Sequence, residues 1–209
     1  MFTIGSNTVG NVEFFAVLSG LLCVFLAGRN SKYNFYVGYV YTILLCVMFA
    51  QKHLYSSMLL QPISLAINII GHYRWTHPRK GEESAADNKA LKVSRMTWKS
   101  VAASIVVVLG LGFVWGWILS GLGDNWFPGV APARIPYLDA CVTMLILLAQ
   151  YLSAQKRWEC WIAWLIVNCV NIVLYIKAGL VFMPIVSALY LINGIISMFS
   201  WNKLYKNNE

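Results

Sequence analysis

Seven long apolar runs constrain this chain more than any other feature. They cover about residues 12–28, 33–51, 54–75, 97–121, 135–154, 159–176 and 180–201. An α-helix needs about 20 apolar residues to cross the hydrocarbon core of a bilayer. A membrane β-barrel would instead show alternating segments of about ten residues, and these runs are continuously apolar. The sequence therefore predicts an all-α polytopic membrane protein with seven transmembrane helices and no strands.

The composition agrees with this class and divides the chain into segments. Hydrophobic residues make up 59% and charged residues 11%, whereas a soluble domain carries about 25% charged residues. Polar residues gather between the third and fourth runs, and Gly and Pro between the fourth and fifth. We expect a first three-helix unit at 1–75, followed by a cytoplasmic loop at 76–96 and a linker helix at 97–121. An outer loop at 122–134 then leads to a second three-helix unit with a cytoplasmic tail at 135–209.

The positive charges predict the orientation. If the N-terminus lies outside, all but three of the 16 basic residues fall in inner segments, the exceptions being Lys52, Arg134 and Lys177. Short cytoplasmic loops are enriched in Lys and Arg, so this places the N-terminus outside and the C-terminus in the cytoplasm. The net charge of +8 then reflects membrane topology. We expect the lipid bilayer, and no nucleic acid, as a partner.

The chain repeats its helix pattern at an interval of 126 residues. Residues 12–75 then overlie residues 138–201 without a gap, with Phe35 on Trp161 and Trp75 on Trp201. Each unit has an odd number of helices, and the linker helix restores the direction of the chain. The pattern predicts two parallel three-helix repeats around one linker, an arrangement that transporters use with the substrate site between the halves.

The sixth run carries the strongest candidate site. Polar and aromatic residues follow one another there in steps of three and four, so they form one stripe on a helix. Indole rings stack on flat, cationic ring systems, and amides bond their substituents. The stripe therefore indicates a site for a heteroaromatic ligand, although packing between helices explains the same residues. Its members are Trp161, Trp164, Asn168, Asn171 and Tyr175.

Other polar residues inside the runs are further candidates, because polar groups are costly in a bilayer. Gln61 and Asn68 share a face of the third run, and Asn193 lies in the seventh. Glu13 and Asp139 begin the first and fifth runs at matching positions, where we expect them in water. His72 lies at the inner end of the third run beside Arg74, where we expect an interfacial residue.

Motifs for chemistry are missing. The chain has no GxxxxGK[ST] phosphate loop and no HExxH pair, and none of its runs carries a carboxylate at its centre. We therefore expect no enzyme, no catalytic residues, no metal and no cofactor, and a facilitator rather than a pump. A membrane enzyme and an assembly protein, in which the stripe only packs, are the alternatives from other classes.

Two motifs resemble the PnuC family of bacterial vitamin transporters. The first is WxxWxxxN in the sixth run, formed here by Trp161, Trp164 and Asn168. The second lies in the third run, where Leu54-Tyr55 and Leu60-Gln61 precede the sequence from Gly71 to Trp75. The resemblance extends over the whole chain, including the arrangement of three, one and three helices.

The resemblance implies a function and an assembly. Members are homotrimers of the bacterial inner membrane, similar to the SWEET sugar transporters, with one path per subunit. They take up nicotinamide riboside for NAD biosynthesis by facilitated diffusion, and a cytoplasmic kinase traps it by phosphorylation. Related members move thiamine or riboflavin, which are the alternative substrates. The motifs place Trp161, Trp164, Asn168 and Gln61 at the substrate. The chain departs from the usual pattern at Ser57, His72 and Asn34-Phe35.

Overall fold

The computed structural model describes residues 2–4, 7–9, 11–51, 55–84, 87–121, 136–177 and 182–207. Seven α-helices run through these described residues, and each coincides with a predicted run to within a few residues at its ends. The helices are α1 (Asn11–Gly28), α2 (Asn34–Gln51), α3 (Tyr55–Thr76), α4 (Trp98–Gly121), α5 (Pro136–Ala154), α6 (Cys160–Lys177) and α7 (Phe182–Lys206).

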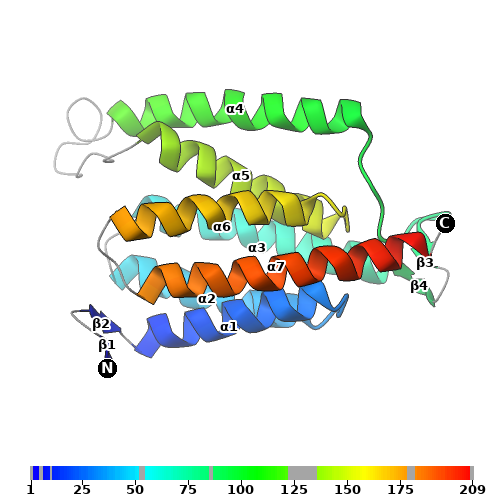
Figure 1. Cartoon of the computed structure of the whole chain (residues 1–209), viewed down its shortest axis with the longest axis horizontal. Coiled ribbons are helices and arrows are strands. Elements are labelled where there is room, and N and C mark those ends of the chain that lie inside the picture. The colour runs from blue at the N-terminus through cyan, green and yellow to red at the C-terminus, as the bar shows by residue number, and fades with distance from the viewer. Residues whose placement is uncertain are drawn as a thin grey trace.

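The helices form one bundle with their axes roughly aligned (Figure 1). By length and composition, α1, α4, α5 and residues Pro184–Lys206 of α7 can each cross a membrane, and Asn34–Met48 and Cys160–Val173 are shorter apolar helices. Large apolar side chains point outward, such as Ile162 and Ile166 on α6. Because lipid is as apolar as these side chains, a bundle of this kind exposes them at no cost.

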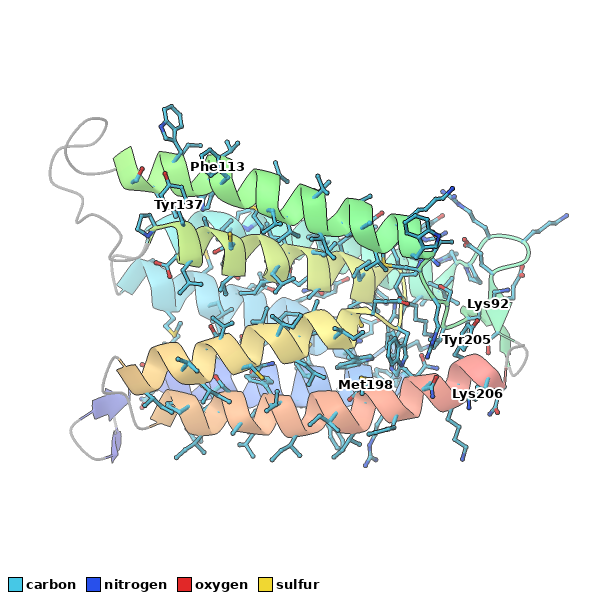
Figure 2. The ribbon with its side chains drawn as sticks, turned by 45° about the horizontal axis from the view of Figure 1, so that its top comes forward. Lys92, Phe113, Tyr137, Met198, Tyr205 and Lys206 are labelled. Carbon is cyan, nitrogen blue, oxygen red and sulfur yellow. The ribbon has the colours of Figure 1, made fainter. Side chains whose placement is uncertain are left out.

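Two sets of three helices pack around a shared interior. The neighbours α1–α2 and α2–α3 pack together, as do α5–α6 and α6–α7, and the sets meet where α1 contacts α7 and α3 contacts α5. Helix α4 lies at the edge of the bundle and packs mainly against α5 (Figure 1). There Gly112 and Gly116 lie against Cys141 and Tyr137, and the ring of Phe113 is 5.7 Å from that of Tyr137 (Figure 2).

The turns after α1 and α5 have the same hydrogen bonds, 126 residues apart. Asn30 donates its backbone N–H to the carbonyl of Ala27, and Lys156 donates to Ser153, both at 3.0 Å. Both residues have positive φ, at 59° and 54°. Such left-handed residues commonly end helices. The chain therefore reverses in the same way at the two positions.

Basic residues gather at one end of the bundle, which we call the basic end. It holds the ends of α1, α3, α5 and α7 and the starts of α2, α4 and α6, and Lys92 and Lys206 lie there in Figure 2. The N-terminal strands, the end of α4 and the start of α5 lie at the opposite end (Figure 1). The predicted outer loop, 122–134, falls outside the described residues.

Short strands correct the expectation that the chain has none. Strand β1 (Phe2–Ile4) pairs with β2 (Asn7–Val9), and β3 (Glu83–Ser84) with β4 (Asp87–Leu91), both antiparallel. Both hairpins lie outside the helices, where water can solvate their edges. Hydropathy patterns detect bilayer-crossing segments and do not resolve hairpins this short.

The β3–β4 hairpin is tied to the basic end by charged groups. Arg74 of α3 pairs with Glu82 at 2.9 Å. Burial alone would raise the pKa of Glu82, but the backbone N–H of Arg79 and the charge of Arg74 lower it below its ordinary value. Lys156 is buried and donates from Nζ to the carbonyl of Leu91 at 2.5 Å. The loop between α3 and α4 is therefore packed onto the bundle.

Candidate functional site

Helix α6 turns the predicted stripe toward the interior of the bundle. Its exposed residues follow steps of four and three, and they are Ile162, Ile166, Cys169, Val173 and Ile176. Trp161 and Asn168 are buried, and Trp164 and Asn171 are half-buried. The helical spacing thus separates an outward apolar face from an inward face of polar and aromatic groups. Tyr175 belongs to α6, but its side chain is outside the part of the chain that the structure describes.

Trp161 leaves a buried donor without a partner. Its side chain is 2% exposed, and its ring packs edge-to-face on Trp201 with centroids 5.3 Å apart. Its Nε1 has no hydrogen-bond acceptor among the described residues. Because an unpaired buried N–H costs about 1–3 kcal/mol, this indole is a candidate to donate to a bound ligand.

Four aromatic residues, Phe35, Trp75, Trp161 and Trp201, form what we call the aromatic cluster at the basic end. Phe35 packs edge-to-face on Trp75 as Trp161 does on Trp201, and the rings of Trp75 and Trp201 lie 5.8 Å apart. Trp75 donates its indole N–H to the carbonyl of Ser153, and Trp201 donates to that of Ala27, both at 3.1 Å. These two indole hydrogen bonds, which we call the reciprocal anchors, each join the third helix of one set to the first helix of the other: α3 to α5 and α7 to α1.

Asn168 is held by its own helix. Its Nδ2 donates to the carbonyl of Trp164 at 2.8 Å, and the side chain is 8% exposed. Thr42, which lies 126 residues earlier, donates to the carbonyl of Gly38 at the same distance. The bond uses one of the two amide N–H donors, so Asn168 keeps one donor and its carbonyl oxygen for other partners.

Helix α3 brings Gln61 and Asn68 to the same interior. Both side chains are half-buried, and Pro62 lies inside the helix. Asn68 packs close to Gly38 of α2, where a Cβ atom would lie 3.2 Å from its Nδ2 and 3.5 Å from Sγ of Cys23. Asn68 therefore fills the space that the missing side chain of Gly38 leaves between α1, α2 and α3.

Helix α7 contributes a second orphaned donor. Asn193 is half-buried, and its Nδ2 is buried without a hydrogen-bond partner in the described part of the chain. The indole of Trp161 on the adjacent α6 is in the same condition. Unsatisfied buried donors are few in folded proteins, and two predicted site residues on neighbouring helices have them.

The structure contradicts the prediction for Glu13 and shows the surroundings of His72. Glu13 is 8% exposed, so the expectation that water surrounds it is wrong, whereas Asp139 is exposed as expected. His72 is half-buried, with Nδ1 3.0 Å from the hydroxyl of Tyr39 and its ring 5.4 Å from that of Phe35. His72 therefore packs against the aromatic cluster. Its place in the sequence beside Arg74 did not predict this contact.

The sequence prediction missed one interior group. Gln150 of α5 has a buried Oε1 without a hydrogen-bond partner among the described residues. Gln150 follows five apolar residues of α5, which begin at Leu145. A polar residue directly after such a run was the sequence signal that could have identified it as an interior group.

Comparison with known proteins identifies the family. A family model described as nicotinamide mononucleotide transporter matches residues 10–203. The chain belongs to this family, the PnuC family of membrane transporters. The resemblance carried by WxxWxxxN is thereby confirmed. Both this membership and the apolar helices make the chain a multi-pass membrane protein.

Curated PnuC relatives and a solved PnuC structure show the range of the similarity. The nicotinamide riboside transporter PnuC of Escherichia coli K12 is 28% identical over 189 residues, which are 84% of this chain and 78% of the relative. The riboflavin/roseoflavin transporter RibM of Streptomyces davaonensis is 28% identical over 187 residues, with 90% and 79% covered. A crystal structure of the vitamin B3 transporter PnuC has a TM-score of 0.72 at 22% identity, with 95% and 83% covered. These PnuC-family relatives are named as transporters, and the solved structure shares the fold.

Proposed function

We propose that this chain takes up nicotinamide riboside by facilitated diffusion, driven by intracellular phosphorylation of the product. The inward stripe of α6 carries the proposal. It places two indoles and two amides on one face, and the described members of this set leave donors for a ligand. Nicotinamide riboside is a flat cation, which suits indole rings, and its hydroxyl and amide groups suit Asn168 and Gln61.

The stripe favours the riboside over its phosphorylated form. The residues assigned to substrate are Trp161, Trp164, Asn168, Asn171, Tyr175, Gln61, Asn68 and Asn193, and none of them is basic. Arg and Lys are the usual partners of a phosphate. The curated PnuC relatives are likewise named for the riboside.

Two parallel repeats, with α4 as the linker in a SWEET-like arrangement, account for the symmetry of the contacts. The supporting observations are the matched turns after α1 and α5 and the reciprocal anchors of Trp75 and Trp201. In transporters of this kind the substrate lies between the repeats near the middle of the membrane. We place the path between α2–α3 and α6–α7, with the aromatic cluster at its basic end.

The basic end faces the cytoplasm in this proposal, so the N-terminus is outside and the C-terminus inside. Arg29, Arg74, Arg95 and Arg157 lie at that end, and cytoplasmic segments collect such charges. Helices α2, α3, α6 and α7 contain no Asp or Glu, which supports diffusion without ion coupling. We further propose that the protein works as a homotrimer in the bacterial inner membrane, with one path per subunit, which is what its resemblance to the family implies.

Riboflavin and related ring compounds are a second candidate class of substrate. The riboflavin/roseoflavin transporter RibM has the same sequence identity to this chain, 28%, as the Escherichia coli relative. Riboflavin, like thiamine, is a flat ring system that indoles can stack on. At the positions 126 residues before the stripe, the first set of helices carries no indole: they hold Phe35, Gly38, Thr42, Leu45 and Phe49. The substrate therefore has to be measured.

Binding to the purified protein in detergent distinguishes these substrates. We expect saturable binding of nicotinamide riboside by calorimetry, and no displacement by equal concentrations of thiamine, riboflavin or nicotinamide mononucleotide. Binding of riboflavin or thiamine alone would keep the family and change the substrate. If none of the four compounds binds a folded protein, the stripe serves packing, as in an assembly protein.

A further inference from the structure

A pocket at the basic end lies apart from the aromatic cluster and the stripe. Its volume is about 270 Å³, and it opens between the segment before α4 and the end of α5. Its polar lining comes from Arg95, Thr97, Ser100, Tyr151, Gln155 and Arg157. Two guanidinium groups, two hydroxyls, a phenol and a carboxamide therefore surround one small space.

Two arginines bring positive charge to this pocket. Arg95 donates from Nη2 to Oδ1 of Asn202 at 2.9 Å, and Arg157 donates from Nη1 to the carbonyl of Arg95 at 2.9 Å. In the described part of the chain neither pairs with a carboxylate. The neighbouring Glu159 accepts the backbone N–H of Met96 instead. A guanidinium has five N–H donors, so each arginine has most of its donors left.

Arg95 is held in place without a counter-ion. Its guanidinium lies 4.4 Å from the ring centre of Trp158 and 5.3 Å from that of Tyr205. These contacts and the bond to Asn202 fix the direction of the charge. A guanidinium that is oriented before binding loses less entropy when it bonds to an anion.

The pocket lies at the level where the membrane begins. Helix α4 starts at Trp98, directly beyond Thr97, and the indole of Trp98 is 75% exposed. The next turns of α4 expose Ile105, Val106 and Val107. Tryptophan and tyrosine favour the interface between hydrocarbon and water. A lipid beside α4 and α5 would therefore bring its phosphate to the height of Arg95 and Arg157.

We propose that this pocket binds the phosphate of an anionic phospholipid. Arg95 and Arg157 form charge-assisted hydrogen bonds to the phosphate oxygens. The hydroxyls of Thr97 and Ser100, which lie 2.9 Å apart, and the amide of Gln155 supply further donors. The acyl chains lie along the apolar face of α4. The bound lipid joins the segment before α4 to the end of α5 and, through Arg95, to α7.

Native mass spectrometry of the purified protein tests this site. The probes are phosphatidylglycerol and the zwitterionic phosphatidylcholine in mixed micelles, and inorganic phosphate without lipid. We expect phosphatidylglycerol to be retained about tenfold more than phosphatidylcholine and to raise the thermal unfolding temperature. Millimolar phosphate should have neither effect. Equal retention of both lipids, or the same stabilisation by phosphate alone, would overturn the lipid assignment.

Variants separate this pocket from general surface charge. Gln155→Glu places a carboxylate in the wall and leaves the contacts of both arginines intact, so the fold should survive while preference for phosphatidylglycerol is lost. Arg95→Gln with Arg157→Gln should give the same loss. Lys203→Gln with Lys206→Gln removes the same charge from exposed residues outside the pocket and should keep the preference. A folded Gln155→Glu protein with undiminished preference would disprove the proposal.

Discussion

Gly71→Ala is expected to destabilise the folded protein by about 1–3 kcal/mol, the usual cost of overpacking. A Cβ at Gly71 would lie 2.8 Å from Cε1 of Phe35, 2.9 Å from Cβ of Ala154 and 3.1 Å from Cα of Ala154. The Cα of Ala154 is backbone and cannot rotate away, so α3 and α5 must separate. Thermal unfolding in detergent, followed by size-exclusion chromatography of the surviving protein, measures the effect.

Gly110→Ala is the matched control for this helix contact. Among the described residues, no atom outside the local helix backbone lies within 4 Å of a Cβ at Gly110, and Ala favours a helix over Gly by about 1 kcal/mol. We therefore expect this variant to unfold at the same or a higher temperature. If Gly71→Ala behaves like Gly110→Ala, α3 and α5 do not approach as closely as described.

Trp161→Phe is expected to weaken substrate binding about tenfold while destabilising the protein less than Trp201→Phe does. Phenylalanine keeps a ring to pack on Trp201 but removes the indole N–H, which has no acceptor in the described chain. If that N–H donates to substrate, its loss removes a hydrogen bond of about 1–1.5 kcal/mol. Calorimetry with nicotinamide riboside measures affinity, and thermal unfolding without substrate measures stability.

Trp201→Phe should show the opposite pattern. Its indole N–H already bonds to the carbonyl of Ala27 at 3.1 Å, in a side chain that is fully buried. Removing the indole N–H leaves the carbonyl of Ala27 without this donor, so the unfolding temperature should fall. The affinity of the folded protein for nicotinamide riboside should change little. Unchanged affinity in Trp161→Phe would exclude the indole N–H from substrate binding.

The helices and the stripe could be predicted because the bilayer simplifies the problem. A spanning helix must satisfy its backbone internally and be apolar over its length, so hydropathy located α1 to α7 closely. Steps of three and four then separated Trp161 and Asn168 from the exposed Ile162 and Ile166. Both inferences depend only on local spacing.

Contacts between distant segments could not be predicted in this way. Buried Lys156 reaches the carbonyl of Leu91, and no local pattern links an α5–α6 turn to a strand 65 residues earlier. Glu13 was assigned to water by its place at a helix start, but its burial depends on tertiary packing. The orphaned donors of Trp161 and Asn193 also required the neighbouring atoms to be known.

Uptake of labelled nicotinamide riboside into proteoliposomes tests the central claim most directly. We predict saturable uptake that stops at equal internal and external concentrations and is unaffected by a proton gradient. Unlabelled nicotinamide riboside should compete with this uptake, and thiamine and riboflavin should not. Trapping of the product by an enclosed kinase should raise total uptake. Absence of uptake by folded protein, or accumulation of unmodified substrate above the external concentration, would contradict the account.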